Sequence, residues 1–149
     1  MITSTSTGEN YVIELSDGSH ISYADVPAES GGQDKFQRPG DILTSSFAAC
    51  MNMTMQRILQ ERGLDYDKVM IEADFDWSKT ERNRLEFYYI VDIQGNLTEQ
   101  EKEEVKAEAR NCTVCQYLQA EKTLTEIGHW REAKEGYETI SAENKSSEI

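Results

Sequence analysis

Long hydrophobic runs are missing from this 149-residue sequence. No apolar stretch approaches the roughly 20 residues that a helix needs to span a bilayer, so we do not expect an integral membrane protein. The first ten residues, MITSTSTGEN, contain no basic residue followed by an apolar stretch, which argues against a secretory signal. These absences predict a protein of the cytoplasm.

Positive charge is also scarce. The chain has 15 Lys and Arg against 28 Asp and Glu, which gives a net charge of −13. A field of this sign repels the phosphates of nucleic acids and the anionic headgroups of lipids. Nucleic acid and membrane surfaces are therefore not expected as partners.

Cysteine and histidine are few, with three and two residues. An odd number of cysteines without an export signal indicates a reducing compartment, where a cysteine is more often catalytic, metal-binding or simply buried than part of a structural disulfide. His20 and His129 are isolated in the sequence, and we assign them no catalytic role. The candidate functional residues are therefore Cys50, Cys112 and Cys115.

The length and the hydrophobic pattern indicate one α+β domain. A chain of 149 residues suffices for one core and is short for two. We expect a single domain over 1–149, with about 1–10 and 132–149 flexible or peripheral. The predicted elements are a hairpin over 11–26, a helix over 39–63, antiparallel strands over 69–77 and 84–95, helical segments over 96–111 and 112–119, and a last strand over 122–130. Hairpins and helices in this order are typical of the α+β class.

The helix expected over 39–63 is apolar on nearly every side of its first four turns. Its apolar residues there are Ile42, Leu43, Phe47, Ala48, Ala49, Met51, Met53 and Met55. A helix of this kind is buried on most faces. Because one layer of antiparallel sheet covers only one side, we expect a second chain to contribute to its burial.

Cys50 lies in the middle of this helix. The commonest role of a free cysteine is that of a small buried hydrophobe. A thiol in mid-helix gains little from the helix dipole, so a nucleophilic role requires a charged partner from another part of the protein.

Cys112 and Cys115 form the sequence C-T-V-C, for which three interpretations compete. A zinc site needs about four ligands, and its usual sign is a second cysteine or histidine pair. A thioredoxin-type pair requires a strand that leads directly into its helix, whereas here a helix is expected before the pair. In the third interpretation one of the two cysteines is the partner of Cys50.

Two segments carry a more specific signal. In GGQDKFQRPGDILTSSFAACMNMT the informative positions are Gly31-Gly32, Asp34, Pro39, Asp41-Ile42-Leu43 and Ala49-Cys50. In IQGNLTEQEKEEVKAEARNCTVCQYL they are Gly95, Leu97-Thr98, Ala109, Cys112, Val114 and Leu118. Together and in this order, the segments resemble the two motifs of the OsmC/Ohr family of thiol-dependent peroxidases, in its OsmC-like branch. The resemblance spans about residues 11–130.

The resemblance implies a fold and a chemistry. The family forms an intertwined homodimer in which antiparallel sheets wrap long central helices and the active sites lie at the subunit interface. Its first cysteine, here Cys50, attacks a hydroperoxide and becomes a sulfenic acid, and its second, here Cys112, converts this acid to a disulfide that a thiol reductant then opens.

The sequence departs from the family pattern at three places. Asp41 stands where the family has glutamate, and Thr113 stands where a proline usually follows the second cysteine. The peroxidases of the family pair an arginine with the carboxylate to stabilise the thiolate, and Arg38 is the only arginine before Cys50. The implied site is therefore Cys50 and Cys112, supported by Asp41 and Arg38, with no metal and no cofactor.

Three functional hypotheses follow. The first is a cytoplasmic reductase of organic hydroperoxides in oxidative-stress defence, with a peroxiredoxin-like activity and a dithiol, lipoyl or thioredoxin-like reductant. The second is an OsmC-like protein with little peroxidase activity that binds a small apolar ligand or senses oxidation. The third is a zinc protein.

Overall fold

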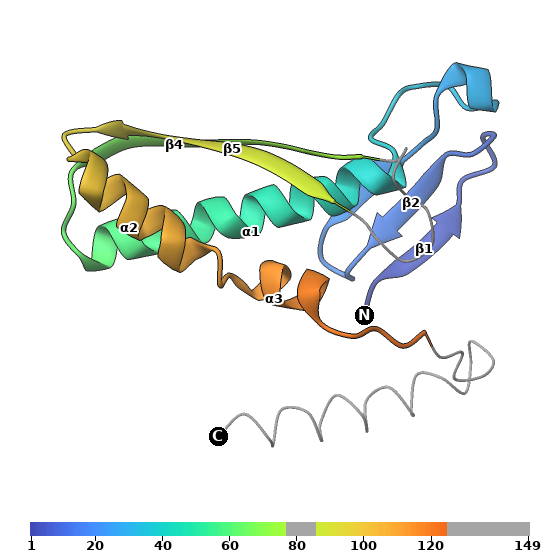
Figure 1. The fold of residues 1–149 in the computed structure, drawn as a ribbon. Helices are drawn as coiled ribbons and strands as arrows, with labels where there is room; N and C mark the ends of the chain where they lie inside the picture. The colour runs from blue at the N-terminus through green and yellow to red at the C-terminus, as the bar shows by residue number, and fades with distance from the viewer. Residues whose placement is uncertain (77–85, 125–149) are drawn as a thin grey trace. The chain divides into compact units, whose positions relative to one another are not determined.

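The structure, a computed structural model, describes residues 1–76 and 86–124. The chain divides into two compact units, Met1–Gln119 and Ala120–Ile149, and all helices and strands named below lie in the first (Figure 1). The strand expected over 122–130 lies mostly outside the described residues, and 132–149 lies wholly outside them; residues 122–124 form neither helix nor strand. That the whole chain is one domain stays a prediction.

The first unit begins with a three-stranded antiparallel sheet in the order β1-β2-β3. Its strands are β1 (Thr3–Ser6), β2 (Ile13–Ser16) and β3 (Ile21–Ala24). Asp17 closes the β2–β3 turn, since its Oδ1 accepts hydrogen bonds from the backbone N–H groups of Ser19 and His20 at 2.8 and 2.7 Å. The predicted hairpin is confirmed. β1 was not predicted, because its sequence TSTS has no apolar alternation and its only described pairing partner is β2.

The loop that leads from β3 to the long helix wraps around a buried carboxylate. Asp25, 1% exposed, accepts hydrogen bonds from the backbone N–H groups of Val26 (2.7 Å), Gln33 (3.2 Å) and Lys35 (3.1 Å). Burial alone raises the pKa of Asp25, but these N–H groups outweigh it, so the pKa lies below its usual range. The loop is therefore ordered by one ionised side chain, and it contains a short 3₁₀ helix, η1 (Ala28–Ser30).

Gly32 is required by this arrangement. A Cβ atom at this position would lie 2.0 Å from the backbone oxygen of Val26 and 2.6 Å from Oδ1 of Asp25. The first atom belongs to the backbone, and the second is held by burial and by the Val26 N–H, so any larger residue must push the loop away from the carboxylate. This contact gives a physical reason for the second glycine of the Gly31-Gly32 pair.

The central element is helix α1 (Pro39–Glu61), which confirms the helix predicted over 39–63. Proline suits its first position because that N–H has no partner within the helix. Its end is a Schellman motif, in which the N–H of Leu64 bonds to the carbonyl of Leu59 (2.9 Å) and that of Gly63 to Gln60 (3.1 Å). Gly63 adopts φ +63°, the left-handed conformation that this motif needs.

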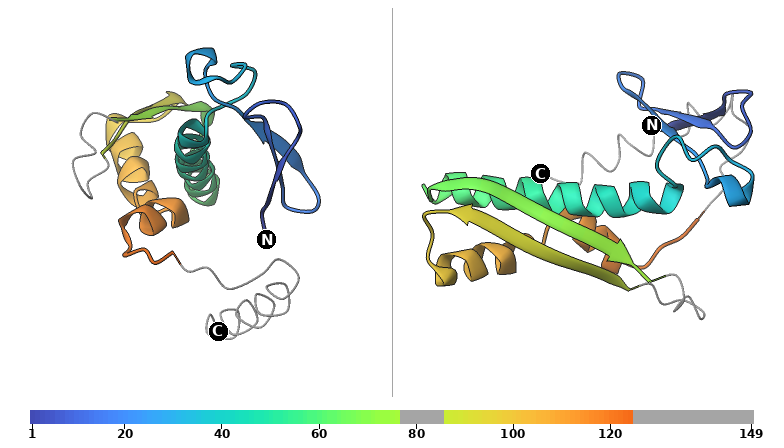
Figure 2. Two further views of the ribbon diagram at one scale, coloured as in Figure 1. Left: turned by 90° about the vertical axis from the view of Figure 1, so that its right-hand side faces the viewer. Right: turned by 90° about the horizontal axis from the view of Figure 1, so that it is seen from above.

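Strands β4 (Tyr66–Phe75) and β5 (Phe87–Gly95) form an antiparallel pair, as predicted for 69–77 and 84–95. The pair runs along α1 as a long twisted ribbon (Figure 2). Val69 faces Ile93 in the register, and both side chains are buried against the helix. Asn52 of α1 donates a hydrogen bond to the backbone oxygen of Val69 at 3.0 Å, which fixes the helix to the edge of the strand.

Two helices follow the ribbon and pack on α1 (Figure 1). α2 (Glu99–Ala109) begins with a capping box: Glu101 N–H donates to Oγ1 of Thr98 at 3.3 Å, and Thr98 N–H donates to the Glu101 carboxylate at 2.8 Å. Arg62, at the end of α1, ion-pairs with Glu104 and Glu108 of α2. α3 (Thr113–Gln119) comes directly after α2.

One hydrophobic core joins these elements. It contains Phe47, Met51, Met55, Ile58, Leu59, Val69, Ile93, Val105, Ala109, Cys112 and Cys115. Phe47 extends the core toward the start of β5. The centroid of its ring lies 5.5 Å from that of Phe87 and 5.4 Å from that of Tyr89. The described residues thus have the predicted α+β architecture with antiparallel sheets.

Part of α1 is open in the single chain. Met53 is 69% exposed and Leu43 is 41% exposed, although both are large and apolar. Two adjoining hollows of about 400 Å³ also open along α1 and β4, and the more apolar of them is lined by Ala48, Ala49, Asn52, Met53, Gln56 and Ile71. A single chain therefore leaves part of α1 uncovered. The expected second chain would have to cover this part.

Replacing Gly32 tests the account of the loop. Gly32→Ala should lower the free energy of unfolding by about 1–3 kcal/mol, because the methyl group overpacks the buried carboxylate and backbone. Urea denaturation gives this difference, with Ser30→Ala, an exposed position in the same loop, as the control. Equal stability of the Gly32→Ala variant and the control would contradict the close approach.

Candidate redox site

Cys50 lies half-buried in the middle of α1. It is one turn after Phe47 and Ser46 and one turn before Met53 and Thr54, so it lies between the buried stripe of the helix and its open side. Its side chain packs on the core cluster that also contains the other two cysteines. The thiol is thus accessible enough to react and close enough to the core to meet a second sulfur.

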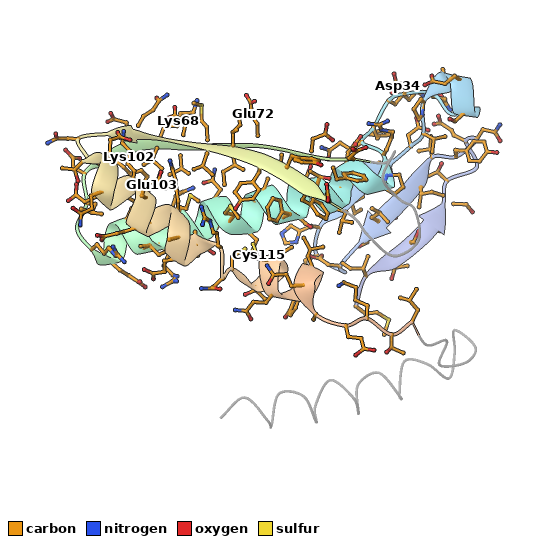
Figure 3. All side chains as sticks on the ribbon, viewed as in Figure 1. Asp34, Lys68, Glu72, Lys102, Glu103 and Cys115 are labelled. Atoms are coloured by element: carbon orange, nitrogen blue, oxygen red, sulfur yellow. The ribbon has the colours of Figure 1, made fainter. Side chains whose placement is uncertain are left out.

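Cys112 and Cys115 lie at the start of α3, the former directly before the helix and the latter within its first turn. Both are buried, with 3% and 5% of their surface exposed. Figure 3 marks Cys115 where α3 faces α1. Because α2 and α3 both pack on α1, the fold brings the C-T-V-C segment to the helix that carries Cys50.

Cys112 interacts with both of the other cysteines. The Cys112 thiol donates a hydrogen bond to Sγ of Cys115 at 2.9 Å, and Cys112 also interacts with the Cys50 thiol. Burial raises the pKa of the Cys112 thiol and the bond to Cys115 raises it further, while the Cys115 N–H and the Cys50 thiol oppose this shift. The structure therefore brings together the two predicted redox residues, Cys50 and Cys112, which are 62 positions apart in the sequence.

Arg38 and Asp41 meet in a bidentate ion pair at the start of α1. Arg38 Nε lies 2.9 Å from Oδ2 of Asp41, and Arg38 Nη2 lies 3.1 Å from Oδ1. The hydrogen bond from Arg38 lowers the pKa of Asp41, and the same bond raises the pKa of Arg38. The carboxylate also accepts the backbone N–H of Arg38 at 3.4 Å, so the pair caps the helix.

Within one chain the ion pair and the thiols do not come together. Asp41 is nine residues before Cys50. In an α-helix this step amounts to about 13 Å along the axis and about half a turn around it. Asp41 therefore points away from the side of α1 that carries Cys50.

The structure bears on each of the three interpretations of the C-T-V-C segment. The pair follows helix α2 and not a strand, which is unlike the thioredoxin arrangement, and Cys112 contacts Cys50 as the third interpretation requires. Among residues 1–76 and 86–124, no group of three His, Cys, Asp or Glu side chains is arranged to hold a metal ion. The described part of the chain also has no helix long and apolar enough to cross a membrane.

Comparison with known families assigns this chain to a family. Residues 32–126 match the family of OsmC-like proteins. This range includes Gly32, the Arg38–Asp41 pair and all three cysteines. The chain belongs to the OsmC-like family. No curated protein matches it in a sequence comparison.

Solved structures of the OsmC/Ohr family have the same fold. The OsmC-like protein of Mycoplasma pneumoniae is similar at a TM-score of 0.69 and 19% identity, over 80% of this chain and 86% of that one. The organic hydroperoxide resistance protein OsmC of Legionella pneumophila gives 0.63 and 20%, over 80% and 88%. The organic hydroperoxide resistance protein OhrB of Bacillus subtilis gives 0.58 and 15%, over 80% and 91%.

The contact between Cys112 and Cys115 is the feature of the site that sequence reasoning did not anticipate. The signal was present, since two cysteines three residues apart share a side when the segment is helical. The resemblance gives Cys115 no role, because no position of the family motif corresponds to it.

The burial difference among the thiols predicts an order of alkylation. At pH 7 iodoacetamide should label Cys50 at least about tenfold faster than Cys112 or Cys115, because only Cys50 is half-exposed and burial keeps Cys112 protonated. Raising the pH should speed labelling of Cys112, since its raised pKa means that the thiolate forms only at higher pH. Peptide mass spectrometry over time measures the rates, with the urea-unfolded protein as control. Native Cys112 that labels as fast as Cys50 would contradict the arrangement.

Proposed function

We propose that this protein is a cysteine-based peroxidase that reduces organic hydroperoxides. The observation that carries the proposal is that the half-buried Cys50 packs on the core cluster that contains the buried Cys112, close enough for the two thiols to interact. Membership of the OsmC-like family and the fold it shares with organic hydroperoxide resistance proteins support the same reaction. The cytoplasm is the expected compartment, where its three thiols are kept reduced.

The first step is oxidation of Cys50. Its thiolate attacks an oxygen of the hydroperoxide, a sulfur–oxygen bond forms, the oxygen–oxygen bond breaks, and the alcohol leaves with a proton from the medium. Cys50 is then a sulfenic acid, two electrons more oxidised. The apolar side chains around the open side of α1, Leu43 and Met53 among them, favour an organic hydroperoxide over hydrogen peroxide.

The second step converts the sulfenic acid to a disulfide. The Cys112 sulfur attacks Sγ of Cys50, the sulfur–oxygen bond breaks, and the hydroxyl leaves as water with the Cys112 proton. The existing contact between the two sulfurs means that this step needs little movement of α3. A dithiol, lipoyl or thioredoxin-like reductant then restores both thiols.

In this proposal a homodimer brings an Arg38 guanidinium close to Cys50, which a single chain cannot do. The Arg38–Asp41 pair lies about 13 Å along α1 from Cys50 and on its other side. Packing of a second copy on the open side of α1 covers the exposed Leu43 and Met53 and carries one copy's ion pair toward the other copy's thiol. In this proposal Asp41 orients Arg38, and Arg38 stabilises the thiolate.

A second candidate function has one observation in its favour. The apolar hollow lined by Ala48, Ala49, Met53 and Ile71 is open in the described chain and suits a small apolar ligand. Saturable binding of such a ligand, together with hydroperoxide reduction no faster than that by a free thiol, would favour this function over the peroxidase.

Two cysteine variants test the peroxidase directly. Cys50→Ser should lower turnover of cumene hydroperoxide with a dithiol reductant by at least about 100-fold, because the nucleophile is gone. Cys112→Ser should still consume one equivalent of hydroperoxide and accumulate a Cys50 sulfenic acid, which dimedone traps. Full turnover by Cys50→Ser would overturn the proposal.

A matched pair of arginine variants tests the thiolate support. Arg38→Gln should slow the first oxidation step about tenfold or more, since each 1.4 kcal/mol of lost thiolate stabilisation removes about tenfold of the reactive species. The control is Arg57→Gln, whose arginine is also exposed and ion-paired on α1, with Glu61, and its rate should stay within about twofold. Stopped-flow kinetics with excess hydroperoxide give both rates. An unchanged rate in Arg38→Gln would show that this cation does not serve Cys50.

A further inference from the structure

The proposed reaction uses Cys50 and Cys112 and gives Cys115 no role. Yet Sγ of Cys115 lies only 2.9 Å from Sγ of Cys112. This separation is about 0.9 Å more than the length of a disulfide bond, about 2.05 Å. Cys112 is therefore poised to bond with either of two sulfurs, Cys50 on one side and Cys115 on the other.

We propose that Cys115 takes over the disulfide, so that oxidation moves from Cys50–Cys112 to Cys112–Cys115 and Cys50 returns as a free thiol. This inference rests on the proposed peroxidase function for the source of the first disulfide. It assigns the chain a relay of three thiols instead of a single resolving cysteine.

The relay step is a thiol–disulfide exchange and needs no outside oxidant or reductant. The Cys115 thiolate attacks Sγ of Cys112, the Cys112–Cys115 bond forms, and the Cys50–Cys112 bond breaks. Cys50 leaves as a thiolate, and the proton lost by Cys115 remains available to it. Attack has to come at Cys112, because Cys112 is the sulfur that Cys115 contacts.

Burial makes the second disulfide different from the first. Cys112 and Cys115 are 3% and 5% exposed, whereas Cys50 is half-buried. The Cys112–Cys115 disulfide is therefore shielded from large reductants, and Cys50 is again available to hydroperoxide. Each chain then reduces two hydroperoxides before it needs a reductant, and ends with a buried disulfide and a Cys50 sulfenic acid.

The same difference in burial predicts how the Cys112–Cys115 disulfide is reduced. Exchange in the reverse direction, with Cys50 attacking Cys112, returns the disulfide to the half-exposed Cys50, where a dithiol reductant can reach it. Cys50 is thus the entry for both hydroperoxide and reductant.

The first test follows the disulfide after hydroperoxide. Reduced wild type and Cys115→Ser receive one equivalent of cumene hydroperoxide, are quenched with N-ethylmaleimide, and are mapped by peptide mass spectrometry. Wild type should end with a Cys112–Cys115 disulfide and alkylated Cys50, while Cys115→Ser should stop at Cys50–Cys112. With two equivalents and dimedone, wild type should carry the label on Cys50 and consume both equivalents, and the variant should consume one.

The second test does not depend on peroxidase activity. One equivalent of dithiodipyridine forms a mixed disulfide with Cys50, which Cys112 then displaces, so exchange starts from the same Cys50–Cys112 bond. Wild type should again end with Cys112–Cys115 and free Cys50. In Cys50→Ser the Cys112–Cys115 disulfide should form at least about tenfold more slowly, because the accessible entry thiol is absent.

The outcomes separate the relay from the peroxidase. A Cys50–Cys112 disulfide that persists in wild type after either reagent, or a Cys50→Ser variant as fast as wild type, would overturn the relay. Failure to consume hydroperoxide, with normal transfer after dithiodipyridine, would overturn the peroxidase and leave the relay standing.

Discussion

The packing of helix α1 on the ribbon β4–β5 and on helices α2 and α3 determines where the sulfurs of this protein meet. The buried stripe of α1 anchors the core, and Cys50 lies at the border between that stripe and the open side. Helix α3 packs on the same helix. This packing alone places Cys112 beside Cys50.

The same helix also limits what one chain can do. A helix turns by about 100° at each residue, so the carboxylate nine positions before Cys50 lies on its other side. The Arg38–Asp41 pair is held in that place by its own bidentate geometry and by the loop around the buried Asp25. The proposed second copy would both cover the exposed apolar side chains of α1 and bring a cation to the thiol. Stability of the helix and reactivity of the thiol would then depend on the same interface.

Much of this was predictable from particular residues. Asp17-Gly18 predicted the hairpin, Pro39 and Gly63 the ends of α1, and Thr98 with Glu101 the start of α2, because each of these signals acts within a few residues. Strand β1 and the Cys112–Cys115 contact were missed. The polar sequence of β1 acquires its structure only by pairing with β2, and the sulfur contact depends on where the short helix α3 begins. The pairing of β1 has no signal in its own sequence, whereas the spacing of the two cysteines indicates a contact only once the segment is known to be helical.

The central claim is that an organic hydroperoxide oxidises two of the three cysteines of this chain to a disulfide. Thiol titration of the unfolded protein tests it most directly, because it counts free sulfurs and is independent of which disulfide finally holds the oxidation. The reduced chain has three free thiols. After one equivalent of organic hydroperoxide the account predicts one thiol per chain, since a disulfide consumes two. Three remaining thiols, or a stable count of two from an unresolved sulfenic acid, would contradict it.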